Sequence, residues 1–237
     1  MDVDARNLDE TSAYKLLIGS IIPRPIAWVS TLSTEGVPNI APISFFTCVG
    51  RKPPRISLSI QPRSDKETLK DTFVNIRDTG EFVVNMATMA QVAAVHESAI
   101  EFEPDEDEFE MAGVEPEAST WVGAPRVKGS PVALECQLWQ AIQAEDGVSH
   151  LVMGEVLGWY LRDDVHVQGR VDFGAIHPVG RLAAEYTHVN NAFVPPLDAT
   201  LLSELTSERM KRLDGHGDTY AGVDDATWSP SGSVLRG

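Results

Sequence analysis

The sequence is poor in cysteine, in positive charge and in long apolar runs, and each shortage excludes a class of protein. Its 237 residues include only two cysteines, Cys48 and Cys136, in no metal-ligand or Cys-x-x-Cys spacing, so we expect two reduced core residues and no metal site. Nineteen lysines and arginines against 35 carboxylates give a formal net charge of -16, which argues against a nucleic-acid partner or a membrane-surface role. No apolar run approaches the roughly 20 residues of a membrane helix, and the N-terminus does not resemble a signal peptide. We therefore expect a cytoplasmic protein.

A dinucleotide fingerprint is also missing. No Gly-x-Gly-x-x-Gly follows a strand pattern, so a nicotinamide dinucleotide would not be held as in a Rossmann fold. The hydrophobic pattern instead predicts about seven strands and few helices, joined mostly as hairpins, which is typical of an antiparallel barrel or sandwich. Strands are expected within residues 26–32, 39–46, 56–60, 81–86, 132–144 and 150–161, and short helices within 69–79 and 89–97.

The chain divides into three parts. Residues 1–22 form a lead-in whose apolar side chains, among them Tyr14 and Leu17, are expected to dock on the core, and residues 23–194 form the main domain. Residues 195–237 form a C-terminal extension, with one amphipathic helix and a turn-rich tail. Seven carboxylates crowd residues 101–110, but the spacing of a calcium loop is absent, so we expect a solvated excursion.

The segment from Arg55 to Gly80 is the most informative stretch. It predicts a strand, a cationic hydroxyl-rich loop and the start of a helix, with Gly80 as the helix stop. Residues 51–70 carry six basic and two acidic side chains, which is a local charge of +4 in an acidic protein. Free N–H groups at a helix N-terminus, with Lys70 and Thr72 beside them, favour a phosphate site. A loop charged only for solubility is the alternative.

Several motifs in sequence order resemble the flavin reductase family. These are Pro23-Arg-Pro-Ile-Ala-Trp-Val-Ser30, Asn39-Ile-Ala-Pro-Ile-Ser-Phe-Phe46, Lys70-Asp-Thr72, Thr79-Gly-Glu-Phe-Val-Val-Asn85, Ser130-Pro-Val-Ala-Leu-Glu-Cys136, His150-Leu-Val-Met-Gly-Glu-Val156 and Pro178-Val-Gly-Arg-Leu182. The resemblance covers roughly residues 12–190. It implies a mainly β fold, a six-stranded antiparallel Greek-key FMN-binding split barrel with a few short helices, which pairs as a homodimer.

The resemblance also implies the site. FMN is the expected cofactor, with FAD as an alternative, and NADH or NADPH is the expected electron donor. The phosphate would be held by Lys70, Asp71 and Thr72, assisted by Arg63 and Ser64. The isoalloxazine and ribityl chain would lie along two segments, comprising Arg24, Pro25, Ile26 and Trp28, and Ala41, Pro42, Ser44 and Phe45. His150 and Arg181 are the catalytic candidates, placed near the flavin and nicotinamide.

The expected function is an NAD(P)H-dependent flavin reductase that transfers a hydride from the nicotinamide to flavin N5. In the family, such proteins include reductase partners of two-component monooxygenases, so a monooxygenase is a candidate partner. The first alternative is a flavoredoxin-like electron-transfer protein that binds flavin but is not reduced directly by NAD(P)H. The second is a β-barrel scaffold without flavin.

Overall fold

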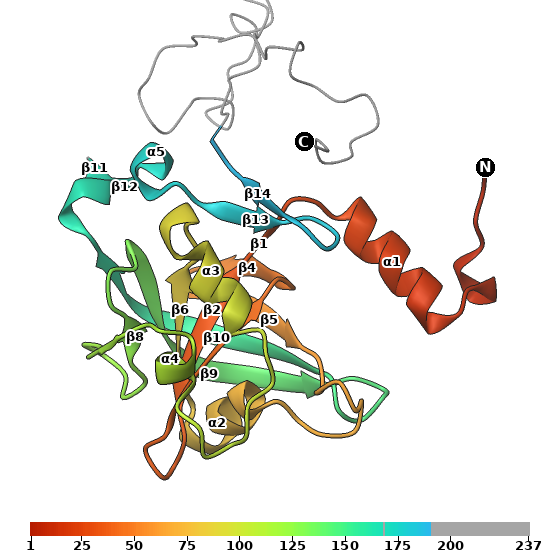
Figure 1. Cartoon of the computed structure of the whole chain (residues 1–237), viewed down its shortest axis with the longest axis horizontal. Coiled ribbons are helices and arrows are strands. Elements are labelled where there is room, and N and C mark those ends of the chain that lie inside the picture. Colours follow the sequence, from red (N-terminus) through yellow and green to blue (C-terminus); the bar gives the residue numbers. More distant parts are fainter. Residues whose placement is uncertain (168, 191–237) are drawn as a thin grey trace, which may run out of the picture. The chain divides into compact units, whose positions relative to one another are not determined.

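The computed structural model describes residues 1–167 and 169–190 (Figure 1). The described part is mainly β, as expected. The predicted extension at residues 195–237 lies outside the described residues. No helix of the described part is both long and apolar enough to cross a membrane.

One large antiparallel sheet organises the molecule. Its strand order is β3-β2-β6-β9-β10-β5-β4. The strands are β2 (Ala27–Leu32), β3 (Pro38–Ile43), β4 (Phe46–Arg51), β5 (Pro54–Ile60), β6 (Glu81–Met86), β9 (Val132–Gln143) and β10 (His150–Leu161). The two longest strands, β9 and β10, form the expected hairpin, in which Leu161 pairs with Val132 and His150 pairs with Gln143.

The strand number implied by the resemblance is wrong, because the split barrel was expected to have six strands. The sheet has seven strands, and within the described residues its edge strands β3 and β4 do not pair with each other. The extra strand arises because the single strand expected over residues 39–46 ends at Ile43, and the chain re-enters the sheet as β4 at Phe46. Both cysteines were expected to be core residues. Cys136 is buried, but Cys48 lies in β4 and is exposed.

The remaining elements are short and surround the sheet. There are three small sheets in the described residues. In one, β13 (Val179–Arg181) lies between β1 (Arg24–Pro25) and β14 (Tyr186–His188) and pairs with both. The other two pair β7 (Pro116–Glu117) with β8 (Arg126–Val127), and β11 (His166–Val167) with β12 (Arg170–Val171). The α-helices are α1 (Glu10–Ser20), α2 (Asp71–Thr79), α3 (Val92–Glu97), α4 (Glu108–Met111) and α5 (Phe173–Ile176). The 3-10 helices are η1 (Ala5–Asn7), η2 (Met89–Gln91) and η3 (Asp163–Val165).

The two largest of the four apolar clusters in the described residues hold the sheet and helices together. Successive side chains of a strand point to opposite faces, so Ala27 and Val29 enter one cluster with α2, whereas Trp28 enters the other with α3 and α4. In the first cluster α2 contributes Phe73 and Ile76. This matches the helix predicted from the apolar stripe. Gly80 ends α2 in the left-handed conformation, at φ 76°, which glycine adopts without steric cost.

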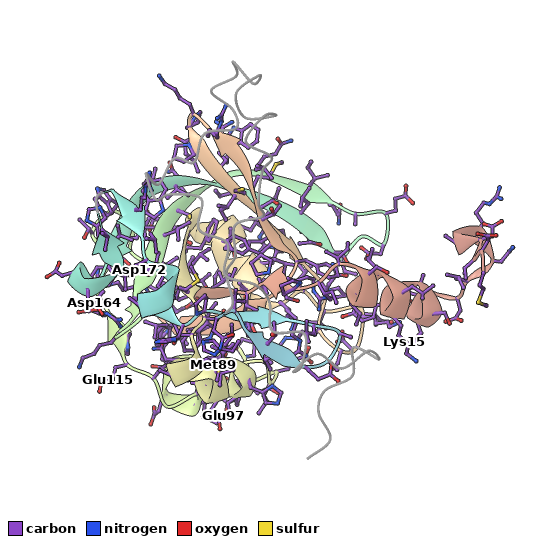
Figure 2. All side chains as sticks on the ribbon, turned by 90° about the horizontal axis from the view of Figure 1, so that it is seen from above. Lys15, Met89, Glu97, Glu115, Asp164 and Asp172 are labelled. Carbon is purple, nitrogen blue, oxygen red and sulfur yellow. The ribbon has the colours of Figure 1, made fainter. Side chains whose placement is uncertain are left out.

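Helix α1 differs from the prediction for the lead-in. Asp9 caps it by accepting from the backbone N–H of Ser12 at 2.9 Å. Its apolar side chains Tyr14, Leu16 and Leu17 are exposed and do not dock on the core. The helix projects away from the sheet in Figure 1, and Figure 2 shows Lys15 of α1 far from Met89 and Glu97, which mark η2 and α3.

Candidate functional site

The loop between β5 and α2 is held in shape by its own hydrogen bonds. Asp65 Oδ1 accepts from the N–H groups of Glu67 and Thr68, each at 2.9 Å, and the N–H of Arg63 donates to the Thr68 carbonyl at 2.8 Å. The hydrogen bond from the Thr68 hydroxyl, together with these backbone bonds, lowers the pKa of Asp65 to about 2. The loop therefore presents its basic side chains from a fixed backbone.

The N-terminus of α2 has no side-chain cap. Lys70 occupies the cap position with extended backbone, and a lysine side chain cannot accept a hydrogen bond. Its carbonyl receives the N–H groups of Phe73 and Val74. Within the described residues, no hydrogen bond uses the N–H groups of Asp71 and Thr72. Two backbone donors and the positive end of the helix dipole are thus available beside a lysine, which suits an anion.

Two neighbouring cavities border this helix end, and Lys70 lines both. The first is lined by Asn39, Ala41, Pro42, Arg63, Lys70, Asp71, Thr72, Ser98, Ala99, Ile100, Glu101 and Glu108. The second is lined by Tyr14, Ile43, Ser44, Phe45, Ser59, Ile60, Gln61 and Lys70. A ligand with an anionic group at Lys70 could extend into the more apolar second cavity.

Charged groups around the first cavity are already paired. Arg63 forms a close ion pair with Asp71 and donates to the Phe102 carbonyl at 2.8 Å. Glu101 accepts from the N–H of Ser64 at 2.9 Å and from its hydroxyl at 2.7 Å, and it lies 3.4 Å from Lys70 Nζ. Lys70, Ser64 and Arg63 therefore form one donor set, with carboxylates as its present acceptors.

A buried polar network lies beneath the first cavity. Thr72 is 1% exposed, and its hydroxyl donates to Asn39 Oδ1 at 3.1 Å. The same oxygen accepts from Thr31, whose hydroxyl accepts in turn from Asn75 Nδ2. The Thr72 hydroxyl thus fixes α2 to β2 and β3, while its backbone N–H stays available.

Glu108 is a site residue that sequence reasoning missed. The expected solvated excursion is mostly exposed, but Glu108 is 6% exposed and accepts from the N–H of Ile40 at 3.0 Å. Burial raises its pKa to about 7, although the hydrogen bond from Ile40 opposes that shift. The sequence contains one local indication that this segment is not a plain solvated loop, because Asp107 is a residue that favours a helix N-cap. In the structure Asp107 caps α4 by accepting from the N–H groups of Phe109 and Glu110.

The structure brings most of the predicted phosphate and flavin residues together. Ala41, Pro42, Arg63, Lys70, Asp71 and Thr72 line the first cavity, and Ser44 and Phe45 line the second. Ser64 lines a third, apolar groove along α1 and contacts Glu101.

The predicted residues of the β1–β2 segment do not line either cavity, although Arg24 Nε donates to Ser44 Oγ of the second cavity at 3.4 Å. Arg24 is buried and donates to the carbonyls of Ile18, Ile21 and Leu182. Trp28 is fully buried, and its Nε1 donates to Ser98 Oγ at 2.8 Å. Ile26 belongs to the same core cluster as Trp28, and Pro25 is exposed in β1. The side chains of Arg24, Ile26 and Trp28 therefore support the site from behind and do not line either cavity.

The two catalytic candidates are also outside the lining of both cavities. His150 is buried, stacks on Phe73 with ring centroids 3.7 Å apart, and donates from Nδ1 to the Val148 carbonyl at 3.0 Å. It opens β10 opposite Ile60, which does line the second cavity. Arg181 in β13 pairs with Arg24 of β1, and its guanidinium lies 4.6 Å from the Tyr186 ring centroid.

Comparison with known proteins identifies the family. The family model described as "Flavin reductase like domain" matches residues 18–177. The chain belongs to this flavin reductase-like family. The match spans β1 to α5, and it contains the β5–α2 loop, all residues that line the first cavity and all that line the second except Tyr14.

Solved structures of known proteins share this fold. Nitrilotriacetate monooxygenase component B from Bacillus cereus is 36% identical, with a TM-score of 0.77 over 81% of this chain and 97% of that one. The 2-nitrobenzoate 2-nitroreductase NbaA of Pseudomonas fluorescens is 29% identical, with a TM-score of 0.76 over 84% and 97%. A protein of Shewanella frigidimarina described as a putative flavin reductase with split barrel domain is 23% identical, with a TM-score of 0.71 over 84% and 100%, and shows the split-barrel fold alone. The family and the split-barrel architecture expected from the motifs are confirmed.

Proposed function

We propose that this flavin reductase-like protein is an FMN-binding oxidoreductase that uses NADH or NADPH to reduce flavin. The observation that carries the proposal is the uncapped N-terminus of α2 beside Lys70, at the junction of two cavities. The relatives named as a monooxygenase component and a nitroreductase support an oxidoreductase role.

The donor set fits a phosphomonoester. Lys70, the Ser64 hydroxyl and N–H, and the first N–H groups of α2 are all donors, as the oxygens of a phosphate require. The carboxylate of Glu101 already accepts from Ser64 and lies near Lys70, so an anion suits this position. The second cavity adds Phe45 and the apolar side of β3, which suit a flat aromatic ring.

The chain would hold and orient the flavin, which carries the redox chemistry. Ser64, Lys70, Asp71 and Thr72 would hold the phosphate, with Arg63 assisting through its pair with Asp71. Ala41, Pro42, Ser44 and Phe45 would contact the ribityl chain and ring. When bound, the flavin would supply N5 as the acceptor of a hydride from the nicotinamide.

The remaining residues of the site have supporting roles in this proposal. Arg24, Pro25, Ile26 and Trp28 would act through backbone position, because three of these side chains are buried. His150 and Arg181 stay predicted contacts of the nicotinamide. Since His150 is stacked on Phe73, its contribution would be to fix the start of β10 at the rim of the second cavity.

We also propose that the protein acts as a cytoplasmic homodimer. The β9–β10 hairpin carries several exposed apolar side chains, which are Trp139, Ile142, Leu151, Leu157 and Trp159. Burying such a surface against a second copy would be favourable. The final electron acceptor would be free flavin or a monooxygenase partner.

Anaerobic reduction tests this function. FMN-loaded protein is mixed with NADH, and separately with NADPH, while absorbance at the flavin band is followed. Rapid bleaching by either nucleotide is expected and names the donor. If FMN stays bound and oxidised with both, the flavoredoxin-like electron-transfer alternative replaces the reductase proposal. If the protein takes up no flavin, both are wrong.

A further inference from the structure

Glu101 places a carboxylate on the donors assigned to the flavin phosphate. Its two oxygens accept from the Ser64 N–H at 2.9 and 3.2 Å, and from the Ser64 hydroxyl at 2.7 Å. The Lys70 ammonium lies 3.4 Å away. The next residue, Phe102, is tied to the same loop because Arg63 donates to its carbonyl at 2.8 Å. The segment after α3 is therefore fastened across the β5–α2 loop through its anionic side chain.

These contacts are those of an ionised carboxylate in a half-covered position. The Glu101 side chain is 29% exposed and that of Lys70 is 31% exposed. Burial opposes ionisation of Glu101, but the hydrogen bonds from Ser64 and the charge of Lys70 hold its pKa below the usual value. At neutral pH the side chain thus carries a full negative charge within hydrogen-bond distance of Ser64.

A phosphate and this carboxylate cannot use the same donors together. Each donor hydrogen of Ser64 satisfies one strong acceptor, and two anions held a few ångströms apart repel each other in a partly desolvated cavity. Asp71 lines the same cavity as Glu101 and adds negative charge, while Arg63 and Lys70 are its cations. Binding of a phosphate would therefore require Glu101 to leave Ser64.

We propose that Glu101 is an internal anion that competes with the flavin phosphate for Ser64 and Lys70, and so sets FMN as an exchanged ligand instead of a permanently held one. This inference rests on the proposed function. Displacing Glu101 reduces the net free energy gained from the phosphate of FMN. Riboflavin lacks the phosphate, so its binding does not involve this competition.

Flavin titrations of E101Q test the inference. The glutamine keeps the size and can still accept from Ser64, but it lacks the charge. Because charge-assisted hydrogen bonds are stronger than neutral ones, we expect E101Q to bind FMN roughly tenfold more tightly than the wild type, with riboflavin affinity unchanged. Affinities are measured from flavin fluorescence quenching, without any nucleotide. E103Q removes the same charge from an exposed position two residues away and is the matched control.

Each outcome separates this inference from the proposed function. FMN binding that tightens in E101Q but not in E103Q, with no change for riboflavin, supports the competition. Equal FMN affinity in all three proteins overturns it while leaving the FMN-binding function intact. Weaker FMN binding in E101Q also overturns it, because Glu101 would then position Ser64 and Lys70 for the phosphate. If none of the proteins binds FMN or riboflavin, the proposed function fails as well.

Discussion

Replacement of Glu108 by glutamine changes how stability depends on pH. The carboxyl is 6% exposed, and burial raises its pKa from 4.5 to about 7. The folded protein therefore holds this proton more tightly than the unfolded chain, so the stability contribution is complete below pH 4.5 and is lost as pH rises through about 7. At 1.36 kcal/mol per pKa unit, the shift corresponds to about 3 kcal/mol. Glutamine does not titrate and can still accept from Ile40, so it escapes this loss.

Chemical denaturation measures the effect directly. Unfolding of the wild type and E108Q is followed by fluorescence of the five tryptophans at pH 4.5 and pH 8. The free energy of unfolding of E108Q, relative to the wild type, is expected to rise by about 3 kcal/mol between these pH values. E110Q removes a charge from an exposed position of the same helix and controls for net charge. A difference between E108Q and the wild type that does not change with pH would refute the reasoning.

Three further predictions concern the sheet. N85A removes a fully buried amide that donates to the Trp28 carbonyl and accepts from the Val127 N–H at 2.8 Å, and we expect it to lower the free energy of unfolding by roughly 1–3 kcal/mol. G154A places a methyl against the buried Phe82 ring and should lower the free energy of unfolding by roughly 1–3 kcal/mol. In G19A the added methyl meets no atom within 4 Å, so this variant should not be destabilised. Equal stability of the two variants in denaturant titrations would contradict this packing. L157D puts a charge on the exposed β10 face and should convert the proposed homodimer to a monomer in sedimentation experiments, while L16D on α1 should not.

The sequence predicted the strands and helices that carry their own periodicity. Helix α2 is confirmed because Phe73 and Ile76 lie one turn apart and Gly80 supplies the left-handed residue that ends it. The β9–β10 hairpin is confirmed because both long apolar runs flank a turn in which Asp146 accepts from the N–H groups of Val148 and Ser149.

The errors occurred where tertiary contacts decide. Strand β4 carries mostly exposed side chains, so it shows no buried alternation that would separate it from β3. In the sequence Glu108 cannot be distinguished from the six other carboxylates of residues 101–110. Its hydrogen bond from the Ile40 N–H of β3 forms only in the folded protein. The exposed side chains of α1 have an amphipathic appearance in sequence, yet no described part of the sheet covers them.

In the site, too, local residue patterns were informative and long-range contacts were not visible in the sequence. The grouping of Arg63, Lys70 and Thr72 around one cavity was predictable because these residues are close in the chain. The side chain of Trp28 was assigned to the flavin from a motif, but its place in the core depends on Ser98, which is 70 positions away. Long-range pairs of this kind are not visible in local residue patterns.

The most direct test of the account is the affinity of K70A for FMN and riboflavin. Lys70 lines both cavities and directly precedes α2, so its loss should weaken FMN binding by roughly tenfold and leave riboflavin binding nearly unchanged. Adding T72A should weaken FMN binding further, because the buried bond to Asn39 that steadies the helix end is also lost. K66A, on an exposed lysine of the same loop, is the control and should bind both flavins as the wild type does. FMN affinity that is the same in K70A, K70A/T72A and the wild type would contradict the phosphate site and with it the central claim.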